Sequence, residues 1–370
     1  MTRIRILVVD DSVVIRKLLS DTLSGDPALE VVGVASDGRI ALAKIPLLNP
    51  DLITLDIEMP VMDGLQTLAA VRKLYAKLPV IMFSTLTEHG AAATLDALAL
   101  GASDYATKPS HTGSTAIALE RIRVELIPKI KALCGIAPLK LLAQPRVRPA
   151  LKVRARSNPR IEIVAIGTST GGPNALAEIL PRIPNDFPVP IVVVQHMPPI
   201  FTRLLAERLA GRAAIPIEEG SAGVILSAGH AWIAPGNFHM KVMRVGLGCR
   251  LNLNQEPQEN SCRPAVDVLF RSVAAAYGAH VLGVVMTGMG SDGVLGAQNI
   301  RDAGGDVIIQ DEASSVVWGM PGLVHASGLA DAAYPLDHLA IEITRRVLQS
   351  RASHPHLELK TYAASEPRPK

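Results

Sequence analysis

The N-terminal part of the sequence alternates between short apolar runs and segments with helical spacing, and this alternation constrains the fold more than any other feature. Residues 4–9 are an apolar run, and Val14, Leu18 and Leu19 follow at helical spacing. The pattern recurs, with strands expected at 4–9, 29–35, 52–56, 80–83 and 104–107 and helices at 14–23, 40–47, 65–74 and 91–100. Strands that alternate with helices in this way predict a doubly wound parallel sheet, whose ligands bind beyond the carboxyl ends of the strands.

Charged and hydroxyl side chains follow the expected strands at these ends. Asp10, Asp11 and Asp56 place three carboxylates together, and they would repel one another unless a divalent cation such as Mg²⁺ neutralised them. Ser84 and Lys108 add a hydroxyl group and a cation. Each residue alone is consistent with an ordinary loop position, but the complete set suits a pocket in which one carboxylate accepts a phosphoryl group.

This set resembles the receiver domain of two-component response regulators over about residues 4–125, including the run from Asp56 to Gly64, Asp-Ile-Glu-Met-Pro-Val-Met-Asp-Gly. The resemblance implies that Asp56 is the phosphoacceptor and that Asp10, Asp11 and Asp56 bind Mg²⁺. It also implies that Ser84 and Lys108 are the switch hydroxyl and the lysine of the pocket.

Composition supports a two-domain α/β protein. The chain has 370 residues, of which 48% are hydrophobic and only 3% aromatic, and its net charge of +3 does not indicate a general nucleic-acid surface. Its three cysteines, Cys134, Cys249 and Cys262, form no CxxC pair, so we expect neither a disulfide framework nor a zinc site, and a reducing cytosol is favoured. The uncharged stretch between Arg271 and Asp292 is broken by glycines, so we expect no membrane span there.

The sequence predicts a first domain at residues 1–130, a basic linker at 131–160, a second domain at 161–348 and a tail without regular structure at 349–370. Between Leu133 and Arg160 there are four prolines and seven Lys or Arg residues but no acid, which is typical of an extended linker. A basic run of this kind also suits DNA, but no recognition helix adjoins it.

The second domain begins with an apolar strand at 161–168 that ends at Ser169 among glycines. The run Gly-Thr-Ser-Thr-Gly fits a nucleophile elbow, in which the glycines permit a tight turn that exposes the hydroxyl group. A phosphate-binding or purely structural turn fits this short pattern equally well. A catalytic serine also requires a base and a group that orients the base.

Two later strands end in residues that could supply these groups. His196 follows the valine-rich strand 189–194, and Asp292 follows the strand 281–286 in a glycine-rich loop. Parallel strands would bring Ser169, His196 and Asp292 to one edge of the sheet. Asp292 alone is also explained as an N-cap of the next helix, and we expect His239 to pack locally rather than to line the cleft.

The receiver, the basic linker and the serine domain together resemble the chemotaxis response-regulator protein-glutamate methylesterases, the CheB family, over about residues 4–348. The motifs are Gly-Thr-Ser169-Thr-Gly-Gly, Gln-His196-Met-Pro-Pro, Ala-Pro-Gly near His239, and Thr-Gly-Met289-Gly-Ser-Asp292-Gly. Thr168 and Ser291 replace the more common alanine and asparagine, which affects fine specificity rather than chemistry.

The resemblance implies a flavodoxin-like receiver domain and a Rossmann-like methylesterase domain, both doubly wound. It implies hydrolysis of glutamate γ-methyl esters and deamidation of glutamines on methyl-accepting chemoreceptors, with a chemotaxis histidine kinase as the phosphodonor and no cofactor for the ester chemistry. Ser169, His196 and Asp292 would form the triad, and backbone N–H groups near Thr170 and Met289 would stabilise the oxyanion. The alternatives are a non-enzymatic response-regulator binding module and a stand-alone hydrolase of small esters.

Overall fold

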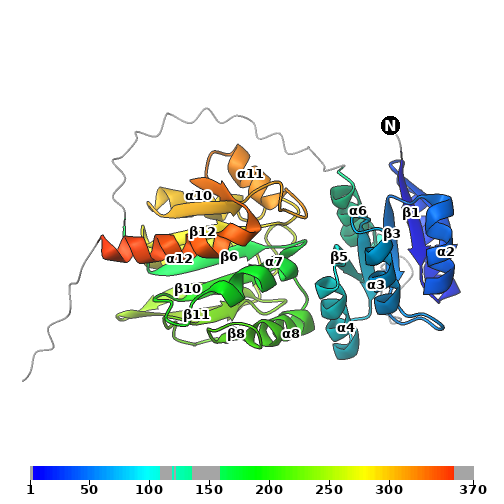
Figure 1. Cartoon of the computed structure of the whole chain (residues 1–370). Coiled ribbons are helices and arrows are strands. Elements are labelled where there is room, and N and C mark those ends of the chain that lie inside the picture. The colour runs from blue at the N-terminus through cyan, green and yellow to red at the C-terminus, as the bar shows by residue number, and fades with distance from the viewer. Residues whose placement is uncertain (1–2, 109–118, 121, 136–158, 354–370) are drawn as a thin grey trace, which may run out of the picture.

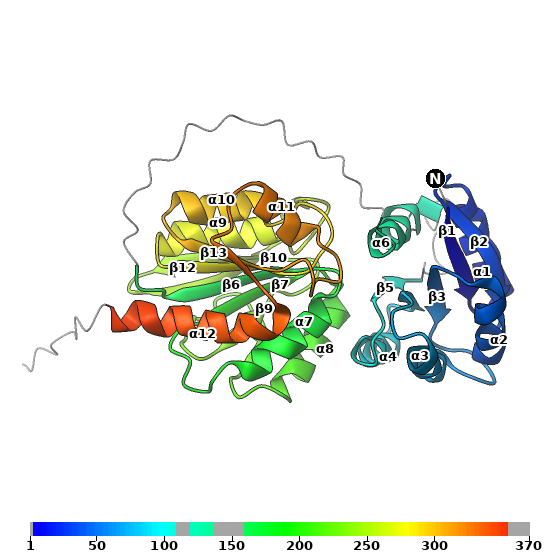
Figure 2. The same cartoon turned by 45° about the horizontal axis from the view of Figure 1, so that its top comes forward.

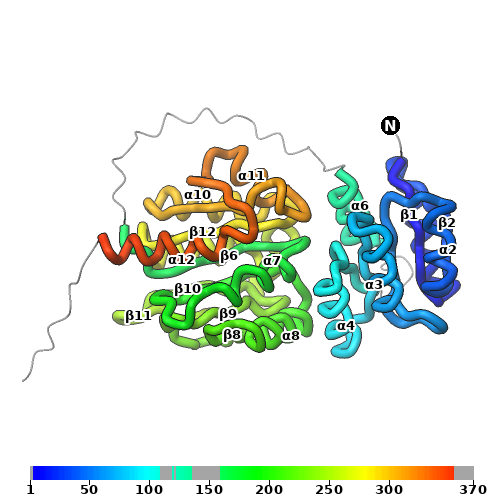
Figure 3. The backbone as a smooth tube through the Cα atoms, viewed as in Figure 1, coloured from blue at the N-terminus to red at the C-terminus, as the bar shows by residue number. Residues whose placement is uncertain are grey.

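The computed structural model describes residues 3–108, 119–120, 122–135 and 159–353, which form two α/β units (Figure 1). The predicted linker lies mostly outside the described residues. The units pack side by side, with α4 of the first next to α7 and α8 of the second (Figures 1 and 3).

The first unit is a parallel sheet of five strands in the order β2-β1-β3-β4-β5. Its elements are β1 (Ile4–Val9), α1 (Val13–Ser24), β2 (Leu29–Ala35), α2 (Gly38–Leu48), β3 (Leu52–Asp56), α3 (Gly64–Leu74), β4 (Val80–Ser84), α4 (Glu88–Ala99), β5 (Asp104–Thr107), the π-helical turn η1 (Ile122–Leu126) and α6 (Ile127–Leu133). Side-chain caps start several helices, among them Asp63, which forms a capping box with Gln66 at α3. The predicted strands and their order of alternation with helices are confirmed.

The second unit contains a parallel sheet of seven strands in the order β14-β13-β12-β6-β7-β9-β8, with a separate antiparallel hairpin, β10-β11. Its elements are β6 (Ile163–Thr168), α7 (Gly172–Ile179), the 3₁₀ turn η2 (Leu180–Arg182), β7 (Ile191–Gln195), α8 (Pro199–Ala210), β8 (Ile217–Glu219), β9 (Ala231–Ile233), β10 (His239–Val245), β11 (Gly248–Asn254), α9 (Val266–Tyr277), β12 (Val281–Val285), α10 (Val294–Asp302), β13 (Asp306–Gln310), α11 (Met320–Ala326), β14 (Ala332–Tyr334) and α12 (Leu336–Ala352).

Alternate residues of β6 face two separate cores, one on each side of this sheet. Val164 and Ile166 pack in the core that includes Leu176 of α7 and Leu339 of α12, whereas Ile163 lies in the core with Phe270 of α9. Figure 2 shows α7, α8 and α12 on one side of the sheet and α9, α10 and α11 on the other. The near-continuous apolar strands are therefore explained by burial on both faces.

The strand order reverses at β6, which makes its carboxyl end the expected ligand site. The chain passes from β6 outward through β7, then returns to β12 on the opposite side of β6 and continues outward to β13 and β14. In open α/β sheets, ligands bind where the strand order reverses, beyond the carboxyl ends of the strands. Ser169 follows β6 at this point.

Two predictions about segments have a structural outcome. The stretch between Arg271 and Asp292 is the end of α9, a turn and the buried strand β12, and no described helix has the length and apolar character needed to cross a bilayer. Helix α12 continues to Ala352, into the predicted tail 349–370, because Ser350 is buried and its hydroxyl accepts a hydrogen bond from Ile161 N at 2.9 Å. The remainder of the tail lies outside the described residues.

Phe270 tests the core that supports α9. Its side chain is fully buried, and a Cβ atom added at Gly296 of α10 would lie 2.5 Å from Phe270 Cβ, so the two helices are in close contact. We expect Phe270→Ala to lower the unfolding free energy of the second unit by about 3–5 kcal/mol, measured by denaturant titration. Leu295→Ala, at a side chain that is 61% exposed, should change it by no more than about 0.5 kcal/mol. Equal losses in both variants would contradict this assignment of the core.

Candidate active site

Ser169 is held by its backbone in the turn between β6 and α7. Its N–H donates to Thr287 O at 3.0 Å, and its carbonyl oxygen accepts hydrogen bonds from Gly172 N at 2.8 Å and from the Gln195 amide at 3.0 Å. Gly171 has a φ of 78°, a conformation that favours glycine, and it ends the turn directly before α7. The backbone of the serine is thus fixed on three sides.

His196 occupies the equivalent position at the end of the neighbouring strand. Thr168 and Gln195 are partners in the parallel pairing of β6 with β7, and His196 N donates to Thr168 O at 3.2 Å. Ser169 and His196 each follow one of these partners, and neighbouring strands lie about 4.8 Å apart. The sheet therefore brings the serine and the histidine next to each other, as the sequence predicted.

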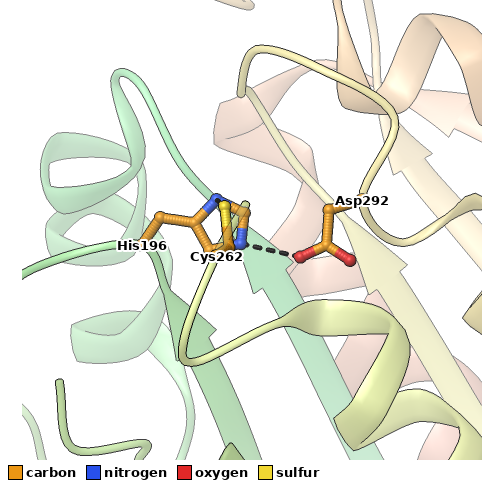
Figure 4. Close-up of side chains that lie close together, drawn as sticks. All are labelled: His196, Cys262 and Asp292. Carbon is orange, nitrogen blue, oxygen red and sulfur yellow. Dashed lines mark hydrogen bonds and ion pairs between the residues drawn. The ribbon is translucent and has the colours of Figure 1, made fainter. Parts of the chain in front are cut away.

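Asp292 reaches the same point from the loop after β12. Its Oδ2 lies 2.8 Å from His196 Nε2 (Figure 4). The carboxylate also accepts hydrogen bonds from the N–H groups of Val266 and Asp267 at the start of α9, at 2.7 and 2.9 Å, and from the Asn260 amide at 2.9 Å. Burial by itself raises the pKa of Asp292, but the hydrogen bond and charge of His196, with these N–H groups, lower it below the usual value.

The tautomer of His196 follows from this contact. An ionised carboxylate only accepts hydrogen bonds, so Nε2 carries a hydrogen, and in the neutral ring Nδ1 has the free lone pair. No hydrogen bond joins Ser169 Oγ to His196 within the described part of the chain. The neighbour of Nδ1 is instead the thiol of Cys262, whose Sγ is 3.6 Å away (Figure 4).

Two opposing effects act on the protonation of His196. Burial of the ring lowers its pKa, but the nearby Cys262 sulfur and the Asp292 carboxylate outweigh burial, so the pKa of His196 is raised above its usual value. An imidazole of this kind takes up a proton readily and is stabilised once protonated. These are the properties of a general base that is oriented by a carboxylate.

The backbone N–H groups of Thr170 and Met289 are available near the serine. Neither has an acceptor among the described residues. Thr170 comes directly after Ser169, and Met289 lies in the loop in which Gly288 approaches the serine so closely that an added Cβ would be 2.8 Å from Ser169 Cβ. Both N–H groups therefore suit stabilisation of a negatively charged oxygen.

Three residues that support this site, Gln195, Asn260 and Cys262, were not predicted from the sequence. The Gln195 side chain bonds the carbonyl oxygens of Ser169 and His196, at 3.0 and 3.2 Å, and Asn260 bridges the carboxylates of Asp292 and Asp267. Cys262 and Asn260 lie in a long irregular segment, where the spacing of residues along the sequence does not indicate which of them reach the site. Gln195 is next to His196, and its position at a strand end was the available clue. His239 packs locally as predicted, with Nε2 3.0 Å from Pro257 O.

The first unit has a separate polar pocket at the ends of β1, β3 and β5. Oxygen atoms of Asp10, Asp11 and Asp56 lie within 4.8 Å of one another, and Lys108 Nζ lies 2.9 Å from Asp10 and 2.7 Å from Asp56. Burial, followed by the charge of Asp10, raises the pKa of Asp56 to about 6. This crowding of carboxylates, all hard oxygen ligands, suits Mg²⁺. Ser84 is at the same edge, but its hydroxyl donates to Gly90 O at 3.0 Å rather than into the pocket.

Comparisons with known proteins match a different family model to each unit. Residues 6–119 match the family model described as response regulator receiver domain, and residues 164–343 match CheB methylesterase. A protein-glutamate methylesterase/protein-glutamine glutaminase of Trichodesmium erythraeum is 54% identical over 356 residues, which cover 94% of this chain and 100% of that protein. A protein of the same name from Nocardioides sp. is 51% identical over 359 residues, covering 95% and 98% of the two chains.

Two solved structures each correspond to one unit. The CheB methylesterase catalytic domain of Thermotoga maritima is 39% identical, with a TM-score of 0.49, and covers 50% of this chain and 98% of its own. The response regulator domain of Thermotoga maritima CheB is 43% identical, with a TM-score of 0.33, and covers 37% of this chain and 99% of its own.

A receiver domain joined to a hydrolase domain of this kind defines the class of response regulators whose output is an enzyme. The chain belongs to the protein-glutamate methylesterase/protein-glutamine glutaminase family. The expectation of an enzyme is thereby confirmed, and the alternative of a non-enzymatic binding module is not supported.

The pH dependence of hydrolysis tests the contact between Cys262 and His196. Because Cys262 raises the pKa of His196, the base form is reached only at higher pH. Cys262→Ala removes this effect, so the acid limb of the kcat/KM profile should move to lower pH. Cys134→Ala, in the receiver, should leave the profile unchanged. A limb that stays in place or moves to higher pH in Cys262→Ala would contradict this account.

Proposed function

We propose that the second domain hydrolyses glutamate γ-methyl esters, and deamidates glutamines, on methyl-accepting chemoreceptors. The observation that carries this proposal is the His196–Asp292 hydrogen bond of 2.8 Å beside Ser169, at the strand end where the sheet order reverses. The names of the relatives state the two activities. The receiver favours a regulated protein substrate over the small esters of a stand-alone hydrolase.

In the proposed reaction, Ser169 is the nucleophile and His196 the general base. Rotation of the serine side chain brings Oγ toward Nδ1, which takes the hydroxyl proton as Oγ bonds to the ester carbonyl carbon. The N–H groups of Thr170 and Met289 stabilise the resulting oxyanion. His196 then returns the proton to the leaving methoxide, which departs as methanol, or to the leaving amide nitrogen of glutamine, which departs as ammonia. Water, deprotonated by His196, then attacks the acyl-enzyme, and His196 returns the proton to Ser169 Oγ as its bond to the acyl group breaks and the product leaves as a free carboxylate.

Asp292 orients the ring throughout this cycle. It keeps the hydrogen on Nε2, so that Nδ1 is the nitrogen that takes the serine proton, and it stabilises the imidazolium that forms. The N–H groups at the start of α9 prevent the carboxylate from turning away from the ring.

Ser169→Ala tests the nucleophile. Loss of a catalytic serine typically lowers turnover by about 10⁴- to 10⁶-fold, so methanol release from methylated receptor membranes should disappear. Ser291→Ala, in the loop that carries Asp292, changes a hydroxyl group with no proposed role and is the matched control. A Ser169→Ala protein that keeps more than about a tenth of the rate would rule out the assignment.

In the receiver, we propose that Asp56 accepts a phosphoryl group from a chemotaxis histidine kinase. Asp10, Asp11 and Asp56 would hold Mg²⁺, which supplies positive charge to the phosphoryl oxygens when bound. Lys108 already contacts two of these carboxylates, and its ammonium group would remain beside the added phosphoryl group. Ser84 would have to give up its hydrogen bond to Gly90 O in order to bond a phosphoryl oxygen.

We further propose that the receiver inhibits the hydrolase by docking over the cleft. Asp104 of β5 accepts a hydrogen bond from the Thr170 hydroxyl at 2.9 Å, directly beside the serine, and Tyr105 stacks on Phe201 of α8 with ring centroids 4.9 Å apart. The amide of Asn174 in α7 donates to Leu98 O of α4 at 2.8 Å. Phosphorylation can activate the hydrolase only by as much as it shifts the equilibrium from the docked to the undocked arrangement. Tenfold activation requires a shift of about 1.4 kcal/mol in the free-energy difference between these two arrangements.

A charge reversal at the rim of this interface tests the docking. Arg208 of α8 pairs with Asp96 of α4 at 2.7 Å. Arg208→Glu places two acids together and should raise the activity of the unphosphorylated protein about two- to fivefold, because an exposed pair contributes roughly 1 kcal/mol or less. Adding Asp96→Arg should restore inhibition.

If removal of residues 1–150 leaves turnover unchanged, inhibition by docking is wrong.

A further inference from the structure

Cys262 has no role in the proposed reaction, yet its thiol lies against the nitrogen that the reaction needs. His196, Cys262 and Asp292 place potential metal-binding atoms within 4.8 Å of one another. They come from three separate parts of the chain, as Figure 4 shows. The cluster combines an imidazole, a thiol and a carboxylate, which distinguishes it from the all-carboxylate cluster in the receiver.

The thiol is held in place by a tight turn. Glu259 and Cys262 exchange backbone hydrogen bonds of 3.2 and 2.9 Å across the turn, and Asn260 and Ser261 between them have φ values of 54° and 60°. This is the arrangement of a two-residue turn with both central residues left-handed. The Asn260 side chain ties the turn to Asp292 at 2.9 Å. Cys262 therefore has a fixed position relative to the His196–Asp292 pair.

We propose that His196 Nδ1 and Cys262 Sγ form an inhibitory zinc(II) site. Zinc binds imidazole nitrogen at about 2.0–2.1 Å and thiolate sulfur at about 2.3 Å, and at the tetrahedral angle these two ligand atoms are separated by about 3.6 Å. The measured Nδ1–Sγ separation is 3.6 Å. Zinc thus replaces the proton between Nδ1 and Sγ with little movement of either side chain.

Asp292 completes the surroundings of such a site. Histidines that bind metals commonly donate their other ring N–H to a carboxylate, which fixes the tautomer and increases the basicity of the ligand. His196 already does so, through Nε2 to Asp292 Oδ2 at 2.8 Å. The tautomer required for zinc at Nδ1 is therefore the one that the protein already stabilises.

Binding has a simple balance. The pair formed by His196 Nδ1 and Cys262 Sγ loses one proton to solvent, from whichever of the two atoms carries it, as the Sγ–Zn and Nδ1–Zn bonds form. Water or the Ser169 hydroxyl fills the remaining positions. Because the same Nδ1 lone pair takes the proton from Ser169 in the proposed reaction, the zinc-bound protein cannot start the ester cleavage.

The ligands select zinc over the hard cations. Thiolate and imidazole suit zinc, whereas Mg²⁺ prefers oxygen ligands such as those of Asp10, Asp11 and Asp56. The two domains thus offer two metals separate sites with opposite consequences: magnesium supports phosphorylation of the receiver, and zinc blocks the hydrolase.

The first experiment measures methanol release by the full-length protein over a range of zinc(II) concentrations with Mg²⁺ held constant. Each variant is compared with its own metal-free rate. Zinc should inhibit the wild type, and Cys262→Ala should raise the half-inhibitory zinc concentration at least about tenfold, since even loss of a supporting partner lowers metal affinity about 10- to 100-fold. Cys134→Ala, which removes the thiol in the receiver, should respond like the wild type. Equal inhibition of Cys262→Ala and wild type would overturn the proposal.

The second experiment does not depend on catalysis. Inhibition rests on the proposed role of His196 as base, but metal binding does not, so the rate of Cys262 alkylation by iodoacetamide is measured by mass spectrometry with and without zinc. Zinc should slow alkylation at least about tenfold in the wild type and much less in His196→Ala. Protection without inhibition would leave the zinc site in place and contradict the role of His196. Absence of protection in the wild type would overturn the zinc site itself.

Discussion

The buried carboxylate of Asp292 is the interaction on which the catalytic domain depends. An ionised carboxylate buried without partners would be strongly destabilising, so its cost must be offset locally. Two N–H groups at the start of α9, the Asn260 amide and the His196 ring all donate to it. Hydrogen bonds to a charged group contribute about 1.5–3 kcal/mol each, and the N-terminus of a helix favours negative charge. The hydrogen bonds that stabilise the buried Asp292 carboxylate therefore also fix the orientation of the His196 ring.

The same hydrogen bonds connect the site to helices α9 and α10, which lie on one face of the sheet. Helix α9 lies over β6 and β12, and its first residues hold Asp292, while Asp267 in its first turn accepts hydrogen bonds from Gly293 and Gly296 at the start of α10. Each helix start thus binds a carboxylate supplied by the other segment. Burial, followed by the charge of Asp292, raises the pKa of Asp267 to about 6, which shows how close the two acids are. The Asn260 amide lies between them and donates to both.

Residues with a proposed chemical role were predictable where they follow strands. Ser169, His196, Asp10 and Asp56 each come directly after or end an apolar run, and parallel pairing brings such positions to one edge of a sheet. Cys262 and Asn260 could not be found in this way, because a long irregular segment carries them back to the site and only tertiary packing determines where it passes. The contact of Asp104 with Thr170 was likewise beyond prediction, because it depends on how two domains dock. The extension of α12 to Ala352 reflects burial of Ser350, which local composition does not reveal.

We propose that Ser169, activated by His196, is the nucleophile of this site. The most direct test is labelling of the full-length protein with a serine-directed fluorophosphonate, followed by mass spectrometry of the modified peptides. The account predicts a single covalent adduct on Ser169 that disappears in His196→Ala. An adduct elsewhere, at Cys262 for example, or undiminished labelling of Ser169 without the histidine, would contradict it.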